Sequence, residues 1–228
     1  MLILFSILVV IVSLIVYNNY WSSPFKLIFL LGGKGSGKTT LLMRYMIAYH
    51  KKGYAIYTNV RSCELPFATI INSEDVGAYV ARPKSCICLD EVGIVYDARR
   101  WKQFRNEWSD YYRYQRQYKN VVVMTSQAWD CDKRVRSLCD KFYLCSSWGA
   151  LSIAKEFTLG SPFAANENTE GDDIKFVPFS WKVTLIPKYA KYFSSFSPPD
   201  KPYLEEIALR SVTLKPSSGR VLRKFGRK

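Results

Sequence analysis

The feature that most constrains this chain is a glycine-rich segment preceded by a short apolar run. The segment GGKGSGKT, Gly32–Thr39, matches the phosphate-loop pattern G-x-x-x-x-G-K-[ST]. The run before it, Lys26–Leu31, is typical of a buried parallel strand, and a helical pattern follows from Lys38 to Lys52. Strand, loop and helix in this order are the context that a phosphate loop requires. The sequence therefore predicts a nucleotide site inside an α/β fold.

The residues of the loop indicate how it would bind phosphate. Its glycines let backbone N–H groups turn toward phosphate oxygens without Cβ clashes, and the helix N-terminus adds partial positive charge. We expect Lys38 to reach the β- and γ-phosphates, and the Thr39 hydroxyl to bind Mg²⁺. The predicted nucleotide-binding residues are Gly32, Gly33, Lys34, Gly35, Ser36, Gly37, Lys38, Thr39 and Thr40.

A second apolar strand ends in two acids. The segment SCICLDEVG, Ser85–Gly93, places Asp90 and Glu91 directly after a short apolar run. An acid at the carboxyl end of a strand beside a phosphate loop can hold Mg²⁺, so Asp90 joins Thr39 as a predicted metal ligand. Glu91 is then placed to polarise an attacking water, which a hydrolase needs and a small-molecule kinase does not. The alternative is that Glu91 is only an exposed residue at a strand end.

Three further segments complete the predicted sheet. Val121–Gln127, VVVMTSQ, is a strand whose last residue, Gln127, is predicted to sense the γ-phosphate or to orient water. Tyr54–Val60 and Phe142–Cys145 are additional strand candidates. Strands that alternate with helical stretches predict an α/β P-loop NTPase with a mostly parallel sheet covered by helices on both faces.

The basic segment Ala98–Lys119 is predicted to be one long helix, because its aromatic residues recur at three- and four-residue steps. This aromatic stripe favours core packing over a platform for stacked bases. The Lys and Arg residues of the segment fit either phosphate binding or a solvated surface. Further along, Ala164–Asp173 is predicted to be an acidic surface loop and Phe176–Pro187 a strand.

The sequence starts with an apolar run, Met1–Tyr17, that contains no charged side chain. As a helix it would be about 26 Å long, near the lower limit for crossing a hydrocarbon core of about 30 Å. Tyr20 and Trp21 follow, as in the aromatic belt of a membrane interface. The alternatives are a cleaved signal peptide, whose basic start and cleavage site are not clear here, and a buried core helix, whose polar face is missing. We therefore expect a single transmembrane helix to precede the nucleotide domain.

Charge predicts the orientation of this anchor. Lys26, Lys34, Lys38 and Arg44 follow the apolar run, so the positive-inside rule places the body in the cytoplasm and the N-terminus outside.

Over the whole chain, 33 Lys and Arg stand against 19 Asp and Glu, a formal net charge of +14. This excess favours an anionic partner, either nucleic acid or an acidic membrane surface.

The C-terminal part has the composition of an extension. The segment SPPDKP, Ser197–Pro202, marks a boundary, and Lys215–Lys228 is rich in Lys and Arg without an acid. This tail is predicted to be disordered, and it fits binding to DNA, binding to anionic lipid, or simple solubilisation. The predicted organisation is an anchor at 1–21, a nucleotide-binding domain at 22–196 and an extension at 197–228.

Four motifs in this order resemble the Zot family (zonula occludens toxin-like ATPases), which includes assembly proteins of filamentous phages. They are GGKGSGKTT, IYTNV, CLDE and VVVMTSQ, the last followed by the basic stretch DKRVR, and the resemblance covers Lys26–Tyr192. The family belongs to the FtsK–HerA class of motor ATPases. Its well-known phage members carry their transmembrane segment after the ATPase domain, whereas the apolar run here comes first.

The resemblance implies an ATPase of the bacterial inner membrane that uses ATP and Mg²⁺ to drive export and assembly of a virion around single-stranded DNA. Its functional roles carry over to Lys38, Thr39, Asp90, Glu91 and Gln127. It also implies a homo-oligomer, as a ring in which an arginine finger reaches a neighbour's nucleotide. The candidate fingers are Arg134 and Arg136, with Arg113 and Arg116 in reserve. Further expected partners are single-stranded DNA or phage coat and assembly proteins, and the lipid bilayer through residues 1–21.

Three functions remain open at this point. The leading one is the membrane-anchored export ATPase. A conjugation or DNA-packaging motor would share all of its catalytic parts. A membrane assembly scaffold would bind nucleotide with little or no hydrolysis, and a measurement of phosphate release separates it from both motors.

Overall fold

The computed structural model describes residues 23–127, 131–159 and 174–194, together with the single positions Ser6, Val9 and Ser13; Trp101 and Ile174 are described in their backbone only. The predicted anchor, apart from those three positions, lies outside the described residues, as do the acidic loop and the C-terminal extension. No helix in the described part is long and apolar enough to cross a membrane. The chain divides into two units, 1–194 and 195–228, and every described residue belongs to the first. The predicted domain boundaries stay predictions.

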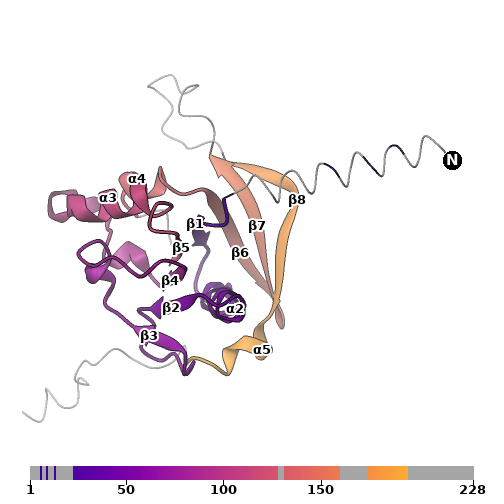
Figure 1. Ribbon diagram of the computed structural model, residues 1–228. Helices are drawn as coiled ribbons and strands as arrows, with labels where there is room; N and C mark the ends of the chain where they lie inside the picture. The colour runs from indigo at the N-terminus through magenta and orange to yellow at the C-terminus, as the bar shows by residue number, and fades with distance from the viewer. Residues whose placement is uncertain are drawn as a thin grey trace, which may run out of the picture. The chain divides into compact units, whose positions relative to one another are not determined.

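One eight-stranded sheet organises the first unit (Figure 1). Its order is β3-β2-β4-β5-β1-β6-β7-β8, with parallel pairing from β3 to β6 and antiparallel pairing from β6 to β8. The strands are β1 (Leu27–Leu31), β2 (Ala55–Thr58), β3 (Ala68–Ile70), β4 (Ser85–Leu89), β5 (Asn120–Ser126), β6 (Lys141–Trp148), β7 (Leu151–Leu159) and β8 (Ile174–Leu185). The predicted α/β architecture with a mostly parallel sheet is confirmed, but β3 and β7 are not among the predicted strands.

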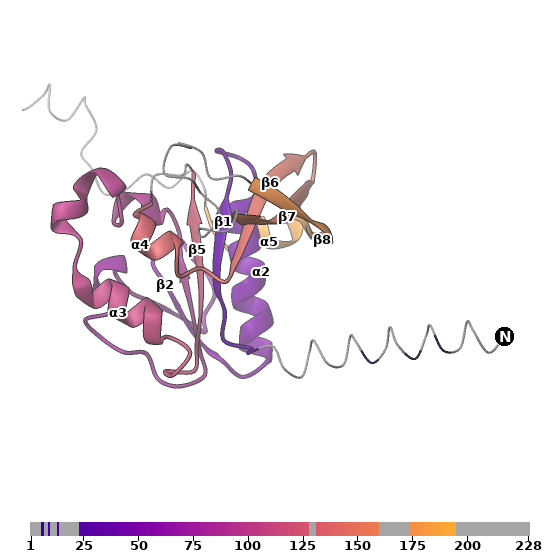
Figure 2. The ribbon, with the colours of Figure 1, turned by 90° about the horizontal axis from the view of Figure 1, so that it is seen from above.

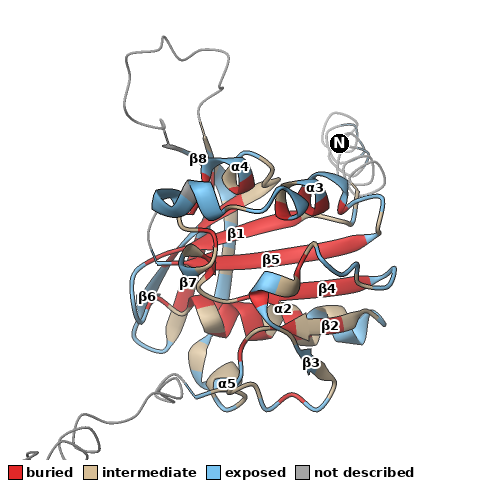
Figure 3. Ribbon diagram, turned by 90° about the vertical axis from the view of Figure 1, so that its left-hand side faces the viewer, coloured by how far each residue is buried: buried red, intermediate tan, exposed pale blue. Residues whose placement is uncertain are grey.

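The central strands are the apolar runs of the sequence. Every residue of β1, β4 and β5 is buried (Figure 3). A parallel strand that is covered on both faces has no polar side to present to water, which is why these segments are mostly apolar and show no alternation of apolar and polar residues.

Helices cover both faces of this sheet (Figure 2). On one face lies α2 (Lys38–Lys51), which buries Leu41 and Met46 against the strands. On the other face, α3 (Asn106–Tyr114) and α4 (Lys133–Arg136) contribute Trp108 and Val135 to a second core cluster. The remaining described elements are the 3-10 helices η1 (Ser73–Asp75), η2 (Val92–Ile94) and η3 (Ala98–Gln103), and the short helix α5 (Ile186–Ala190).

The prediction of one long helix over Ala98–Lys119 is wrong. The segment forms η3, with a kink at Arg100, and then α3, and Arg105 between them is extended. Phe104, in the break between the two helices, and Trp108 of α3 pack on the buried ring of Tyr96, whose centroid lies 6.3 Å from that of Phe104 and 4.9 Å from that of Trp108. These tertiary contacts override the helical period. Buried Trp108 agrees with the prediction that the aromatic stripe belongs to the core.

Beyond β1 the sheet continues as an antiparallel extension, β6 to β8, which curves around α2 (Figure 1). A two-residue turn at Gly149 and Ala150 joins β6 to β7, and Gly149 takes the positive φ of 56° that such turns favour. The pairing of β7 with β8 is irregular between Lys155, which pairs with Trp181, and Phe157, which pairs with Phe176. Phe179 lies within this stretch of β8 and has a φ of 58°. The sequence-predicted strand at Phe176–Pro187 is therefore confirmed, but with a bulge.

Candidate nucleotide-binding site

The phosphate loop and the two acids lie at the same edge of the sheet. The loop follows β1, Asp90 follows β4, and Gln127 follows β5, which lies between β4 and β1 in the sheet. Because these strands are parallel, their carboxyl ends meet at one edge, which is where α/β proteins bind ligands. The arrangement places the segments that the sequence singled out side by side.

The loop is closely packed where it meets β7 and open to solvent at Gly33 and Gly35. Gly37 has a φ of 82°, and a Cβ there would lie 2.5 Å from the Cβ of Ser152 on β7. By contrast, Cβ atoms added at Gly33 and Gly35 would meet nothing within 4 Å. The Ser36 hydroxyl is buried and has no hydrogen-bond partner in the structure. An open cradle with a buried polar atom fits a phosphate group.

Lys38 lies across the loop. Its side chain is almost fully buried, and its ammonium donates hydrogen bonds to the carbonyl oxygens of Gly32 at 2.6 Å and Gly33 at 2.9 Å. The cation is therefore held over the backbone that would surround a phosphate, as predicted for the lysine of the motif.

Thr39 and Asp90 form the centre of the site. The Thr39 hydroxyl donates a 3.0 Å hydrogen bond to Asp90 Oδ2, and the Thr125 hydroxyl on β5 donates to Asp90 Oδ1. A hydroxyl and a carboxylate are the hard oxygen ligands that Mg²⁺ prefers. The donor set therefore fits the predicted metal.

Asn59, which was not among the predicted site residues, fixes the backbone of Asp90. Its Oδ1 accepts a 2.7 Å hydrogen bond from the Asp90 N–H, and its Nδ2 donates to the Asp90 carbonyl at 2.8 Å and to the Ser73 hydroxyl at 2.8 Å. Asn59 directly follows β2, the neighbour of β4. The signal in the sequence was its place at a strand end, in the IYTNV motif.

Glu91 has a backbone conformation that is uncommon for its residue type. Its φ is 54°, in the left-handed region, and its N–H donates a 3.1 Å hydrogen bond to the Thr125 hydroxyl. One carboxylate oxygen is buried. Left-handed non-glycine residues cost about 1 kcal/mol or more, and they cluster at functional sites. Glu91 is therefore partly buried and has a fixed backbone beside Asp90, whereas the alternative was a freely exposed strand-end residue; its role in hydrolysis stays a prediction.

The remaining candidates lie farther along the chain. Gln127 is exposed directly after β5. Arg134 donates to Asp132 from Nε at 3.0 Å and from Nη2 at 2.9 Å, and its guanidinium lies 4.0 Å from the ring centroid of Phe104. The hydrogen bond from Arg134 also holds the pKa of Asp132 below its ordinary value. Arg136 shares α4 with it, on the sheet face opposite α2.

The reserve arginines differ in their surroundings. Arg113 is exposed on α3, whereas Arg116 forms an ion pair with Asp140. A finger from Arg116 or Arg134 would have to break an ion pair within its own chain before reaching a neighbour.

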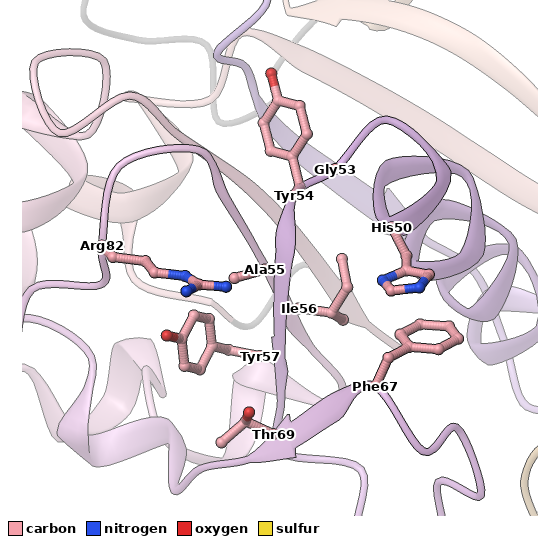
Figure 4. Close-up of a pocket in the computed structure, with 9 residues that line it drawn as sticks. All are labelled: His50, Gly53, Tyr54, Ala55, Ile56, Tyr57, Phe67, Thr69 and Arg82. Atoms are coloured by element: carbon pink, nitrogen blue, oxygen red, sulfur yellow. The ribbon is translucent and has the colours of Figure 1, made fainter.

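A separate cavity of about 450 Å³ lies at the amino end of β2, the edge opposite the phosphate loop (Figure 4). Its lining includes Tyr54, Phe67 and Arg82, and the ring of His50 stacks on Phe67 at a centroid distance of 3.8 Å. His50 is exposed at the end of α2. This cavity does not belong to the candidate nucleotide site.

Comparison with known protein families gives one match. The family described as zonular occludens toxin (Zot) matches residues 66–188, more than half of the 228 residues. The matched segment begins after the phosphate loop and contains Asp90, Glu91 and Gln127. No curated protein matches the chain.

Among solved structures, the N-terminal domain of zonular occludens toxin from Neisseria meningitidis matches with a TM-score of 0.52 and 18% identity, over 75% of this chain and 100% of that one. This likeness shows the fold. The genome packaging NTPase B204 of Sulfolobus turreted icosahedral virus 2, in complex with ATP-gammaS, matches with a TM-score of 0.43 and 13% identity over 56% of this chain and 78% of that one. FlaH, a flagellar accessory protein from Methanocaldococcus jannaschii, has a TM-score of 0.42 and 12% identity over 57% of this chain and 77% of that one. The last two likenesses are too weak to support a functional conclusion.

Proposed function

The chain belongs to the zonular occludens toxin (Zot) family, and we propose that it is a membrane-anchored ATPase that drives assembly and export of a filamentous phage, or of its single-stranded DNA, across the bacterial inner membrane. The fold is an α/β P-loop NTPase-like mixed sheet, mostly parallel. The proposal adds ATP hydrolysis, the membrane anchor and the exported cargo.

The observation that carries the hydrolytic part is the hydrogen bond between Thr39 and Asp90 beside an open phosphate loop. Lys38 supplies the positive charge at the loop, and its ammonium exchanges loop carbonyls for phosphate oxygens when ATP enters. Thr39 and Asp90 would hold Mg²⁺, which supplies charge stabilisation at the phosphate oxygens when it is bound.

Glu91 is the proposed general base. It accepts a proton from the attacking water, whose oxygen forms a bond to the γ-phosphorus while the bond to the leaving ADP oxygen breaks, giving ADP and phosphate. The backbone of Glu91 is held by Thr125 directly after Asp90, which supports a role of its carboxylate beside the metal ligands. Gln127, exposed at the same edge, would orient the water. An arginine from a neighbouring copy in a ring would complete the site.

The cargo and the location are supported by the family and by the sequence. Family membership favours phage assembly. The apolar run Met1–Tyr17 and the cations after it favour an anchor with the body in the cytoplasm, where ATP is available. The net charge of +14 favours a polyanion such as single-stranded DNA as the partner of the body.

The test is phosphate release from the full chain in detergent or vesicles. We expect Lys38→Ala to lose nucleotide binding, and Glu91→Gln to keep ATP binding while hydrolysis falls by roughly 10²–10⁴-fold. Glu64→Gln is the matched control, because Glu64 is exposed on a loop outside the site and undergoes the same chemical change. Equal background release from the wild type and both site variants would favour the nucleotide-binding scaffold and reject the motor.

A further inference from the structure

The antiparallel extension carries a row of apolar side chains that face away from the body. Cross-strand partners share a face, and the register pairs Leu144 with Lys155 and Lys155 with Trp181. The next partners on this face extend the row toward the hairpin turn. We call the apolar members the outer apolar face: Leu144, Trp148, Leu151, Ile153, Trp181, Val183 and Leu185.

Most of this face is open to solvent. Trp148 is 76% exposed, Trp181 is 63% exposed, and Val183, Leu185 and Leu144 are each more than 40% exposed. Figure 1 shows β6 to β8 curving around α2, so that their other side is turned outward. Contiguous apolar surface of this kind is uncommon on a soluble monomer, and it marks a site of contact with a partner.

The opposite face of the same strands is already occupied. Tyr143, Cys145 and Ala154 belong to the core cluster that contains α2. Ser152 contacts the phosphate loop, where its hydroxyl donates to the carbonyl of Ser36. Only the outer apolar face is therefore free to receive a partner on this part of the sheet.

The charge at the centre of the outer apolar face favours an anionic partner. The described parts of β6, β7 and β8 carry four lysines, Lys141, Lys155, Lys175 and Lys182, and one acid, Glu156. Lys141 and Lys182 lie on the inner side, against Glu156 and the ring of Tyr143. Glu156 lies on the inner side, where it accepts hydrogen bonds from Lys141 and Ser180. Among the outer-face positions of the register, Lys155 is thus the charged residue, in the middle of the row and next to Trp181. Tryptophan beside lysine on an apolar surface is typical of contact with lipid headgroups.

A bilayer is also within reach of this face. Ser23 leads into the amino end of β1, and Leu144, the first member of the face, pairs with Leu31 at the carboxyl end, about 13 Å further along the strand and one strand away. The five residues between the apolar run Met1–Tyr17 and Ser23 can span up to about 17 Å when extended. If the run is in the membrane, the bilayer surface is held beside the extension at high effective concentration.

A second copy of the chain fits this face less well. Symmetric packing of the face on itself would bring the Lys155 ammonium groups of both copies into one apolar interface, where neither finds an acid on the face. Burying a charge without a partner costs several kcal/mol. A headgroup region offers both phosphates for Lys155 and a hydrated interface for the indole N–H groups.

We propose that the outer apolar face lies on the surface of an anionic lipid bilayer and forms a second membrane contact of this chain. The proposal rests on the membrane anchoring of the proposed function and is independent of ATP hydrolysis. The contact fixes how the body is oriented on the membrane, because the anchor alone is one tether and would let the body rotate.

The experiment is tryptophan quenching by brominated lipid. The full chain is reconstituted in vesicles of phosphatidylcholine and phosphatidylglycerol with brominated acyl chains, and compared with the variant Trp148→Phe/Trp181→Phe. Both side chains are more than half exposed, so their replacement leaves the core intact. We expect the double variant to lose most of the quenching seen for the wild type, while the quenching of Trp21, at the anchor, remains in both. Trp108→Phe is the matched control, since Trp108 is 5% exposed in the core, and it should leave the quenching unchanged.

A second variant tests the charge. Lys155→Glu keeps both tryptophans and should weaken their quenching in anionic vesicles, whereas Lys51→Glu at the exposed end of α2 should not. Equal quenching of the wild type and the Trp148→Phe/Trp181→Phe variant overturns the proposal. So does chemical cross-linking that places this face against a second copy.

This design distinguishes a failure of the ATPase proposal from a failure of the membrane-contact proposal. Phosphate release is measured on the same vesicles. Absence of hydrolysis with persistent quenching of Trp148 and Trp181 rejects the ATPase and keeps the membrane contact. Normal hydrolysis with equal quenching of both proteins rejects the contact and keeps the ATPase.

Discussion

The Thr39 hydroxyl donates a 3.0 Å hydrogen bond to the carboxylate of Asp90, although the two residues are 51 positions apart in the chain. Thr125 donates to the other oxygen of the same carboxylate. The ends of β1, β4 and β5 are therefore tied together through one acid. Any change that moves Asp90 should disturb the metal site before it disturbs the phosphate loop.

Replacing Asn59 tests this relationship. Asn59→Ala removes both hydrogen bonds that hold the backbone of Asp90. We expect Mg²⁺-dependent hydrolysis to fall by roughly 10–100-fold, as is usual for residues that orient a metal ligand, while nucleotide binding without Mg²⁺ is retained. Titration of Mg²⁺ against phosphate release measures the effect. Asn72→Ala, an exposed asparagine near η1, is the control, and an unchanged Mg²⁺ requirement in Asn59→Ala would refute the role.

Ser152 connects the antiparallel extension to the phosphate loop. Ser152→Ala removes the 3.0 Å hydrogen bond to the Ser36 carbonyl, which is worth about 1 kcal/mol, or roughly fivefold in affinity. The loop then loses one of its supports, so we expect weaker binding of ATP with little change in turnover at saturation. Titration with a non-hydrolysable ATP analogue reports the change. Ser146→Ala, on the outer side of the same hairpin, should bind as the wild type does.

Gly37 should not tolerate a side chain. Gly37→Ala combines a φ of 82° with a Cβ placed 2.5 Å from the Cβ of Ser152, so we expect a loss of stability greater than about 1 kcal/mol. Gly33→Ala, where a Cβ meets nothing within 4 Å, should unfold close to the wild-type temperature. Thermal unfolding compares the two. Adding Ser152→Gly to Gly37→Ala removes the clash but leaves the backbone strain, so it should restore only part of the loss.

Glu156 predicts a pH dependence of stability. Burial raises the pKa of this carboxyl, but hydrogen bonds from Ser180, Lys141 and Tyr143 outweigh it, so that the pKa lies below its ordinary value. A carboxyl whose pKa is lower in the folded than in the unfolded state stabilises the fold above the unfolded pKa, and this stability is lost as the pH falls through the folded pKa.

The measurement is urea unfolding at several pH values. Glu156→Gln should be less stable than the wild type at pH 7, by about 1–2 kcal/mol for the lost charge-assisted bonds. The difference should shrink as the pH falls below about 4.5, the range where free glutamate protonates. Glu64→Gln should show no such trend, and a pH-independent difference for Glu156→Gln would contradict the assignment.

The sequence predicted the centre of the sheet better than its margins. β1, β4 and β5 are buried on both faces, so their apolar runs and the polar residues at their ends stand out. β7 has one face exposed and one covered, and β3 has only three residues, so neither gives a comparable signal. The break before α3 depends on packing around Tyr96, which no local pattern contains.

In the candidate site, too, some residues could be predicted from the sequence and others are revealed only by the fold. The phosphate loop, Asp90 and Glu91 are read from short contiguous motifs. Asn59 and Ser152 act through neighbours that are far away in the sequence: Asn59 through the pairing of β2 with β4, and Ser152 across 116 positions to Ser36. A motif search does not reveal such contacts, because they arise only when the sheet has assembled.

The bulge in β8 bears on how the edge of this sheet could pair with further strands. β8 ends the described sheet, and a long apolar strand in that position is a template for pairing with further strands. Pro178 offers no backbone N–H, and Phe179 beside it takes a positive φ, so the row of donors and acceptors is interrupted in the irregular stretch of the strand. Such an interruption disfavours pairing of the edge with further strands, while it leaves the broad side of the strand available.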